Sequence, residues 1–107
     1  MQFVCGVVDK QGVRRILTAE STPTLENIDD AARRMTALPV DWGPEADQEA
    51  SRWAAWIILD TVTGAVIADR YCEQYAAEVV RKLSTDRMWL LPVGEVEEWL
   101  RTKQKVN

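Results

Sequence analysis

The sequence predicts an α+β fold, in which a mainly antiparallel sheet of four to five strands carries about three helices. Short apolar runs bounded by turn residues predict the strands, and two of these runs are followed closely by an aspartate and a glycine. Longer stretches with apolar residues at helical spacing predict the helices. A chain of 107 residues suits one core, so we expect residues 1–107 to form a single domain.

The first predicted unit, residues 1–38, is a β-hairpin followed by a helix. Residues 3–8 and 13–18 read as strands, and the segment DKQG between them suits a tight turn in which Gly12 takes a positive φ. Residues 21–38 then place apolar side chains at helical spacing, with a proline near the start. We therefore expect a ββα arrangement here.

A second ββα unit is predicted at residues 53–84, after an acidic connector at residues 39–52. The run 53–59 reads as a strand with two apolar faces, which raises the question of what covers the second face. The unit continues with a turn at residues 60–64, a return strand at 65–68 and a helix at 73–83. The repeated order fits an internal duplication, with chance recurrence of a common motif as the alternative.

The last part of the chain, residues 85–107, is predicted to add one strand and one helix. The apolar run at residues 88–93 reads as the strand. Residues 94–103 read as the helix, because acidic residues crowd its start and basic residues its end, which matches the helix dipole.

Composition excludes several classes of function. The chain has no histidine, two cysteines and a net charge of -4. Histidine-based catalysis, zinc sites that need histidine and disulfide frameworks are therefore excluded, and we expect no enzyme activity, no metal and no cofactor. The apolar stretch at the N-terminus is too short for a signal peptide or a membrane span, so we expect a cytoplasmic location and no membrane contact.

Five tryptophans in this chain are the unusual feature. Tryptophan is enriched where proteins meet, because its side chain buries a large area and keeps a polar N–H. On the predicted strand Trp56 and Ile58 face away from the helices. We expect a partner-binding surface formed by Trp56, Ile58, Trp42 and Trp89, with a fully internal role for the tryptophans as the alternative.

Basic residues offer a second candidate surface. Arg14, Arg33 and Arg34 are the expected phosphate contacts if these side chains converge in the fold, and ordinary solvated charges are the other interpretation. A nucleic-acid-associated regulator is therefore the alternative function.

The stretch WIILDTVTGAVIADRYCEQYAAEVVRKL resembles small uncharacterised proteins of actinobacteria and their phages, which share an apolar strand, a D-x-x-T-G segment and an alanine-rich helix. The resemblance implies an accessory protein of a phage or mobile element that binds and blocks a larger partner. Together with the tryptophans, it favours a small non-enzymatic protein-binding module, an inhibitor or regulator. Its partner would be another protein or, as a homodimer, a second copy of the chain.

Overall fold

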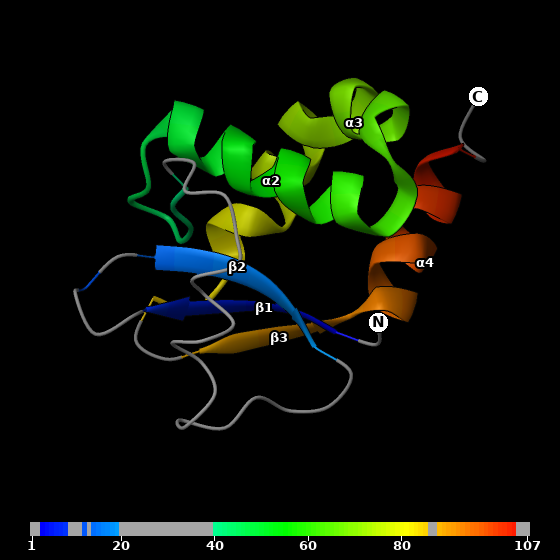
Figure 1. Cartoon of the computed structure of the whole chain (residues 1–107). Coiled ribbons are helices and arrows are strands. Elements are labelled where there is room, and N and C mark those ends of the chain that lie inside the picture. The colour runs from blue at the N-terminus through cyan, green and yellow to red at the C-terminus, as the bar shows by residue number, and fades with distance from the viewer. Residues whose placement is uncertain (1–2, 9–11, 13, 20–39, 86–87, 105–107) are drawn as a thin grey trace.

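The computed structural model describes residues 3–8, 12, 14–19, 40–85 and 88–104. The fold is α+β, as predicted, with three α-helices and one three-stranded antiparallel sheet in these residues (Figure 1). The elements are β1 (Phe3–Val8), β2 (Arg14–Ala19), α2 (Gln48–Thr63), α3 (Ala65–Glu78), the short 3-10 helix η1 (Val80–Lys82), β3 (Trp89–Pro92) and α4 (Val93–Gln104).

The sheet has the strand order β2-β1-β3, with β1 in the centre and both neighbours antiparallel to it. Cys5 of β1 lies opposite Leu17 of β2 on one side and opposite Leu90 of β3 on the other. The strands predicted at residues 3–8, 13–18 and 88–93 are therefore confirmed. The prediction of four to five strands is wrong, because the structure shows three strands in the residues it describes.

Residues 53–59 are not a strand but the middle of helix α2. The carboxylate of Asp47 caps this helix by accepting hydrogen bonds from the backbone N–H groups of Glu49 (3.1 Å) and Ala50 (3.2 Å). The residues buried in the middle of the helix are Ala54, Ala55, Ile58 and Leu59, a spacing that gives one helical stripe. The apolar run that suggested a strand with two covered faces is thus a helix with one wide buried face.

The predicted turn at residues 60–64 and return strand at 65–68 are also wrong, since Gly64 alone joins helix α2 to helix α3. Gly64 has φ 110° and ψ 169°, a conformation that essentially only glycine adopts. Its N–H donates to the carbonyl of Asp60, and its own carbonyl accepts from the N–H of Ala68. Residues 53–84 therefore do not form a second ββα unit, and the predicted duplication loses its structural basis.

The three remaining helix predictions have different outcomes. The predicted helix at residues 73–83 begins earlier, at Ala65 of α3, and residues 80–82 form η1 rather than α-helix. The helix predicted at 94–103 is confirmed as α4. The helix predicted at residues 21–38 lies wholly outside the described residues.

One face of the sheet is covered by helix α2, and α3 packs against α2 (Figure 1). Val4 of β1 and Ile16 of β2 meet the buried stripe of α2 in the same core. Helix α4 follows β3 directly and adds Val96 and Leu100. Within the described residues, no helix combines the length and the apolar character needed to cross a membrane.

Aromatic contacts and an ion pair fix helix α4 to α3. The ring of Trp99 on α4 lies edge-on to the ring of Tyr75, with centroids 4.8 Å apart. Lys103 lies over the Trp99 ring and forms a 2.7 Å ion pair with Glu78, whose carboxyl pKa is lowered mainly by this hydrogen bond. The C-terminal helix is therefore part of the same packed body as the α2/α3 pair.

Candidate interaction site

Three of the four residues predicted to bind a partner are in the core. Ile58 is fully buried, and Trp42 and Trp89 are 2% and 6% exposed. The two indoles pack edge to face, with ring centroids 5.3 Å apart. Their burial leaves these side chains almost no surface to offer a partner, so the structure corrects their role to core packing.

The position of the Trp89 ring also explains why residue 6 is a glycine. Gly6 lies opposite Trp89 in the sheet, and the indole of Trp89 crosses the position that a Cβ at residue 6 would occupy. The strand can accommodate the ring there only because residue 6 has no side chain. The indole nitrogen of Trp89 is buried and has no hydrogen-bond partner among the residues that the structure describes, so packing holds the ring in place.

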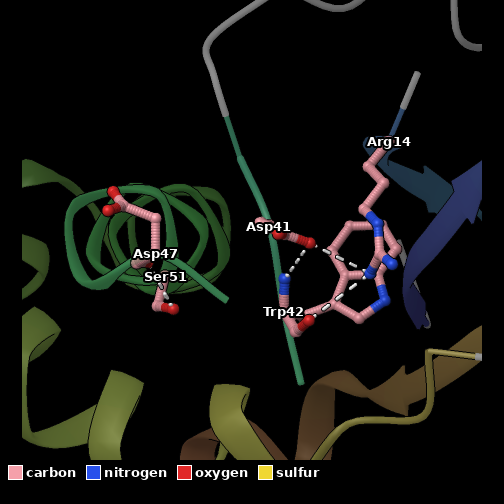
Figure 2. Close-up of polar contacts among 5 residues, drawn as sticks. All are labelled: Arg14, Asp41, Trp42, Asp47 and Ser51. Atoms are coloured by element: carbon pink, nitrogen blue, oxygen red, sulfur yellow. Dashed lines mark hydrogen bonds and ion pairs between the residues drawn. The ribbon is translucent and has the colours of Figure 1, made fainter. Parts of the chain in front are cut away.

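Arg14, the first residue of β2, holds the connector rather than presenting a free charge (Figure 2). Its guanidinium lies 3.0 Å from a carboxylate oxygen of Asp41, donates to the carbonyl of Trp42 at 3.4 Å and lies 4.9 Å from the centre of the Trp42 ring. The same carboxylate oxygen accepts the N–H of Trp42 at 2.8 Å. The network fixes Trp42 in the core. Arg33 and Arg34 lie outside the described residues.

Trp56 is the predicted partner-binding residue that remains accessible. It is half-buried on helix α2, and its indole N–H donates to the carboxylate of Asp69 on α3 at 2.7 Å. Trp53 is also half-buried and packs against Trp56 with ring centroids 6.3 Å apart. Both indoles therefore stand beside helix α3 rather than on opposite faces of a strand.

Two adjoining hollows lie along the α2/α3 pair, and we call them together the α2/α3 groove. The first, of about 640 Å³, contains the two indoles, and the second has a volume of about 510 Å³. Arg52 and Glu73 line both hollows and form a 3.8 Å ion pair between them. The first hollow is lined by Arg52, Trp53, Trp56, Asp69, Arg70, Cys72 and Glu73. The second is lined by Asp47, Gln48, Glu49, Ser51, Arg52, Glu73, Ala76, Ala77 and Arg81.

The thiol in the groove is a weak nucleophile. Burial is the largest influence on Cys72 and raises its pKa, while the nearby Arg52 lowers it by a smaller amount. Cys72 is therefore a protonated thiol at neutral pH, and the thiolate is the reactive form. No group of three or more acidic or cysteine side chains within the described ranges is placed to hold a metal ion.

Most of the groove was missed by the sequence analysis. The strand interpretation of residues 53–59 separated Trp53 from Trp56 and gave no reason to bring α3 beside them. One signal was available: Glu49, Arg52, Trp53 and Trp56 follow the spacing i, i+3, i+4, i+7, which is one face of a helix. Because Glu49 and Arg52 are charged, that face could be recognised as a solvent-exposed surface beside the buried stripe.

The chain matches a known family model. Residues 5–102 match a family of unknown function, DUF6166. The searches of curated proteins and of solved structures each found no match.

Proposed function

We propose that this chain, which belongs to the DUF6166 family of unknown function, is a small non-enzymatic protein-binding module, an inhibitor or regulator that contacts its partner through the α2/α3 groove. The observation that carries the proposal is the pair of half-exposed indoles, Trp53 and Trp56, in an open groove. A partner that covers them would remove a large aromatic area from water.

The indoles are ordered before any partner arrives. The hydrogen bond from Trp56 to Asp69 and the edge contact with Trp53 fix the orientation of the rings. Binding then costs less side-chain entropy than it would with freely rotating residues. Preordered tryptophans flanked by an arginine are typical of the residues that dominate binding energy at protein interfaces.

The charges around the groove suit a protein partner better than a polyanion. Arg52 is paired with Glu73, and the acidic residues Asp47 and Glu49 line the same groove. Phosphate-rich ligands need a surface of one positive sign, whereas a protein surface can match both signs. For the alternative function, a nucleic-acid regulator, Arg14 is already engaged with Asp41, and no observation in the described residues favours it.

The proposal is tested by capture with the full chain as bait from the lysate of its host, followed by mass spectrometry. The partner should be captured by the wild type and lost at least tenfold with Arg70→Ala, because Arg70 is exposed in the groove. Arg101→Ala, an exposed arginine on α4, is the matched control and should retain the partner. Equal capture by both variants would reject the groove as the binding surface.

A further inference from the structure

We infer that Gly64 is a conformational switch, at which helices α2 and α3 can merge into one helix while two copies of the chain exchange their C-terminal halves. The exchanged form is a domain-swapped dimer, in which the part of each copy after Gly64 packs on the part before Gly64 of the other. The switch is independent of what binds the α2/α3 groove, because the groove has the same contacts in both forms.

Only one residue interrupts the helical hydrogen-bond pattern between α2 and α3. The N–H of Gly64 donates to the carbonyl of Asp60, and the N–H of Ala68 donates to the carbonyl of Gly64, so both bonds have the spacing of an α-helix. The helical bonds missing between them run from the N–H groups of residues 65–67 to the carbonyls of residues 61–63. A change of Gly64 from φ 110° and ψ 169° to helical angles brings these donors to these acceptors.

The helix ends at this junction carry few of the usual stop signals. Among the described residues, no side chain caps the start of helix α3, and its first turn contains no acidic residue. The last turn of α2 contains no basic residue. The start of α2 is different, since the Asp47 carboxylate accepts from two backbone N–H groups there. The break between α2 and α3 is therefore maintained by Gly64 and by the packing of the two helices.

That packing is antiparallel, which is an arrangement that a second copy can restore. Trp56 contacts Asp69, and Arg52, one turn earlier on α2, contacts Glu73, one turn later on α3. A merged helix separates Trp56 from Asp69 within one chain by about 20 Å. Two merged helices that lie antiparallel, related by a two-fold axis near Gly64, bring Trp56 of each copy to Asp69 of the other.

The shared core explains why the merged helix needs a second copy. Ala55 and Ile58 of α2 lie in the same buried cluster as Ala68 and Tyr75 of α3. In a single open chain these side chains would face water, whereas in the exchanged dimer each has the same neighbours from the other copy. Strand β3 follows α3 and pairs with β1 of the other copy, as it pairs with its own β1 in the closed form. The dimer thus keeps the contacts between the halves and adds three backbone hydrogen bonds per chain.

Helix propensity keeps the wild-type chain closed. Glycine is unfavourable inside a helix, and residues 61–63, 66 and 67 beside it are β-branched. Exchange also requires the two halves of one core to separate, so it takes place during folding and depends on protein concentration. A dimer formed in this way persists on dilution, because its dissociation requires the same separation.

The first test is Gly64→Ala, because the two forms respond to it in opposite ways. Alanine adopts φ 110° and ψ 169° only with strain, but it favours a helix more than glycine does. Apart from its chain neighbours, no atom of the described residues lies within 4 Å of a Cβ at residue 64, so the backbone conformation causes the effect.

Wild type and Gly64→Ala are unfolded in guanidinium chloride and refolded at concentrations from about 1 to about 500 µM. Light scattering after size exclusion should show a species of twice the 12.1 kDa chain mass. Its fraction should be about tenfold or more higher in Gly64→Ala than in wild type at the same concentration. A Gly64→Ala chain that folds and stays at 12.1 kDa at every concentration would overturn the inference.

Gly12→Ala is the matched control. Gly12 also has a positive φ, 81°, and open space around its Cβ position, but it does not join two helices. This variant should lose stability and remain a monomer, and a dimer fraction equal to that of Gly64→Ala would reject the junction as the cause. If Gly64→Ala fails to fold by circular dichroism, wild type refolded at about 500 µM decides. A dimer that persists on dilution is then expected, and monomer alone would overturn the inference.

The second test distinguishes an exchanged dimer from two closed chains side by side. Gln48 and Ala77 are exposed and line the same hollow of about 510 Å³, so spin labels on cysteines at these positions lie close together in the closed form. Along one merged helix from residue 48 to residue 77, the labels are about 44 Å apart. Cys72→Ser removes the other accessible thiol.

The labelled Gly64→Ala chain is refolded with an excess of unlabelled chain, so that a dimer with a label contains one labelled copy. Electron paramagnetic resonance of the dimer should then give a distance of about 44 Å within the labelled chain. A short distance, equal to that of the wild-type monomer with the same labels, would mean that the chains stay closed in the dimer and would reject the exchange.

Discussion

The indole N–H of Trp56 on helix α2 donates a 2.7 Å hydrogen bond to the carboxylate of Asp69 on helix α3, 13 positions along the chain. A hydrogen bond from a neutral donor to a charged acceptor is stronger than a hydrogen bond between two neutral groups. Because the bond is exposed to water, its net contribution to the free energy of unfolding is smaller. The bond links the two helices that form the groove. It also fixes the side chain of Trp56, the predicted interface residue that remains accessible.

Removal of this bond should weaken the fold modestly. Trp56→Phe keeps an aromatic ring but removes the N–H, and we expect the free energy of unfolding to fall by about 1 kcal/mol. Asp69→Asn keeps an oxygen acceptor and should lose less than Asp69→Ala. Urea unfolding of the three variants measures the differences. Equal stability of Asp69→Ala and wild type would mean that the bond contributes nothing in solution.

The N-cap of α2 should contribute a similar free energy to the stability of the fold. The Asp47 carboxylate accepts from two backbone N–H groups at the start of this helix. Asp47→Ala leaves both donors to water, so we expect a loss of about 1 kcal/mol, and Asp47→Ser should recover most of it. Thermal melts followed by circular dichroism check this, and a rise in melting temperature for Asp47→Ala would contradict it.

Gly6→Ala should be far more damaging than its size suggests. The added methyl group falls on the Trp89 ring, and the ring in turn packs on Trp42 in the core. We expect a loss of about 2–3 kcal/mol or more, in the range of overpacked cores. Gly94→Ala on α4 is the control, because its new Cβ lies at an exposed position and, apart from its chain neighbours and its own helix backbone, comes within 4 Å of no atom of the described residues. That change should be neutral or stabilise the helix by about 0.5–1 kcal/mol.

Stability should fall at alkaline pH through Cys5. Burial raises the pKa of the Cys5 thiol to about 11 from its ordinary value of 9.0. Between these values the unfolded chain releases the proton while the folded chain keeps it, so unfolding becomes easier as the pH rises. The contribution is complete below about pH 9 and is lost toward pH 11, with a slope of up to about 1.4 kcal/mol per pH unit.

Denaturant titrations from pH 7 to pH 11 would show this slope, and Cys5→Ala should remove it. Tyr75, whose pKa is raised mainly by burial, adds a further loss above its ordinary value of 10.0 and remains in the Cys5→Ala variant. A thiol reagent should label the half-buried Cys72 first and Cys5 only on unfolding. Rapid labelling of Cys5 in the folded chain would be evidence against its burial.

Local signals predicted β1, β2, β3 and α4 correctly, because each lies in a short segment with its own pattern. The prediction for residues 53–68 was wrong because two tryptophans and three isoleucines make any face of the segment look apolar, and a period of 2 was accepted where the buried stripe has a period of 3.6. The spacing from Asp60 to Gly64 also suits either a hairpin turn or the end of a helix.

The candidate site was predicted only in part. Trp56 is accessible, as predicted, although the prediction placed it on a strand and the structure places it on helix α2. Whether Trp42 and Trp89 were exposed depended on contacts distant in sequence. Trp42 is placed by Arg14, 28 positions away, and Trp89 by the glycine opposite it in the sheet. A sequence pattern around either tryptophan contains no information about these distant residues.

The single-residue junction at Gly64 sets the rotation of helix α3 about its axis relative to helix α2. Successive residues of an α-helix are rotated by about 100°, so one residue inserted at Gly64 would turn every side chain of α3 by that angle relative to α2. Asp69 would leave Trp56, and Glu73 would leave Arg52, while each helix by itself kept its length and caps. The groove thus depends on the number of residues at this junction as well as on the identities of the residues that line it.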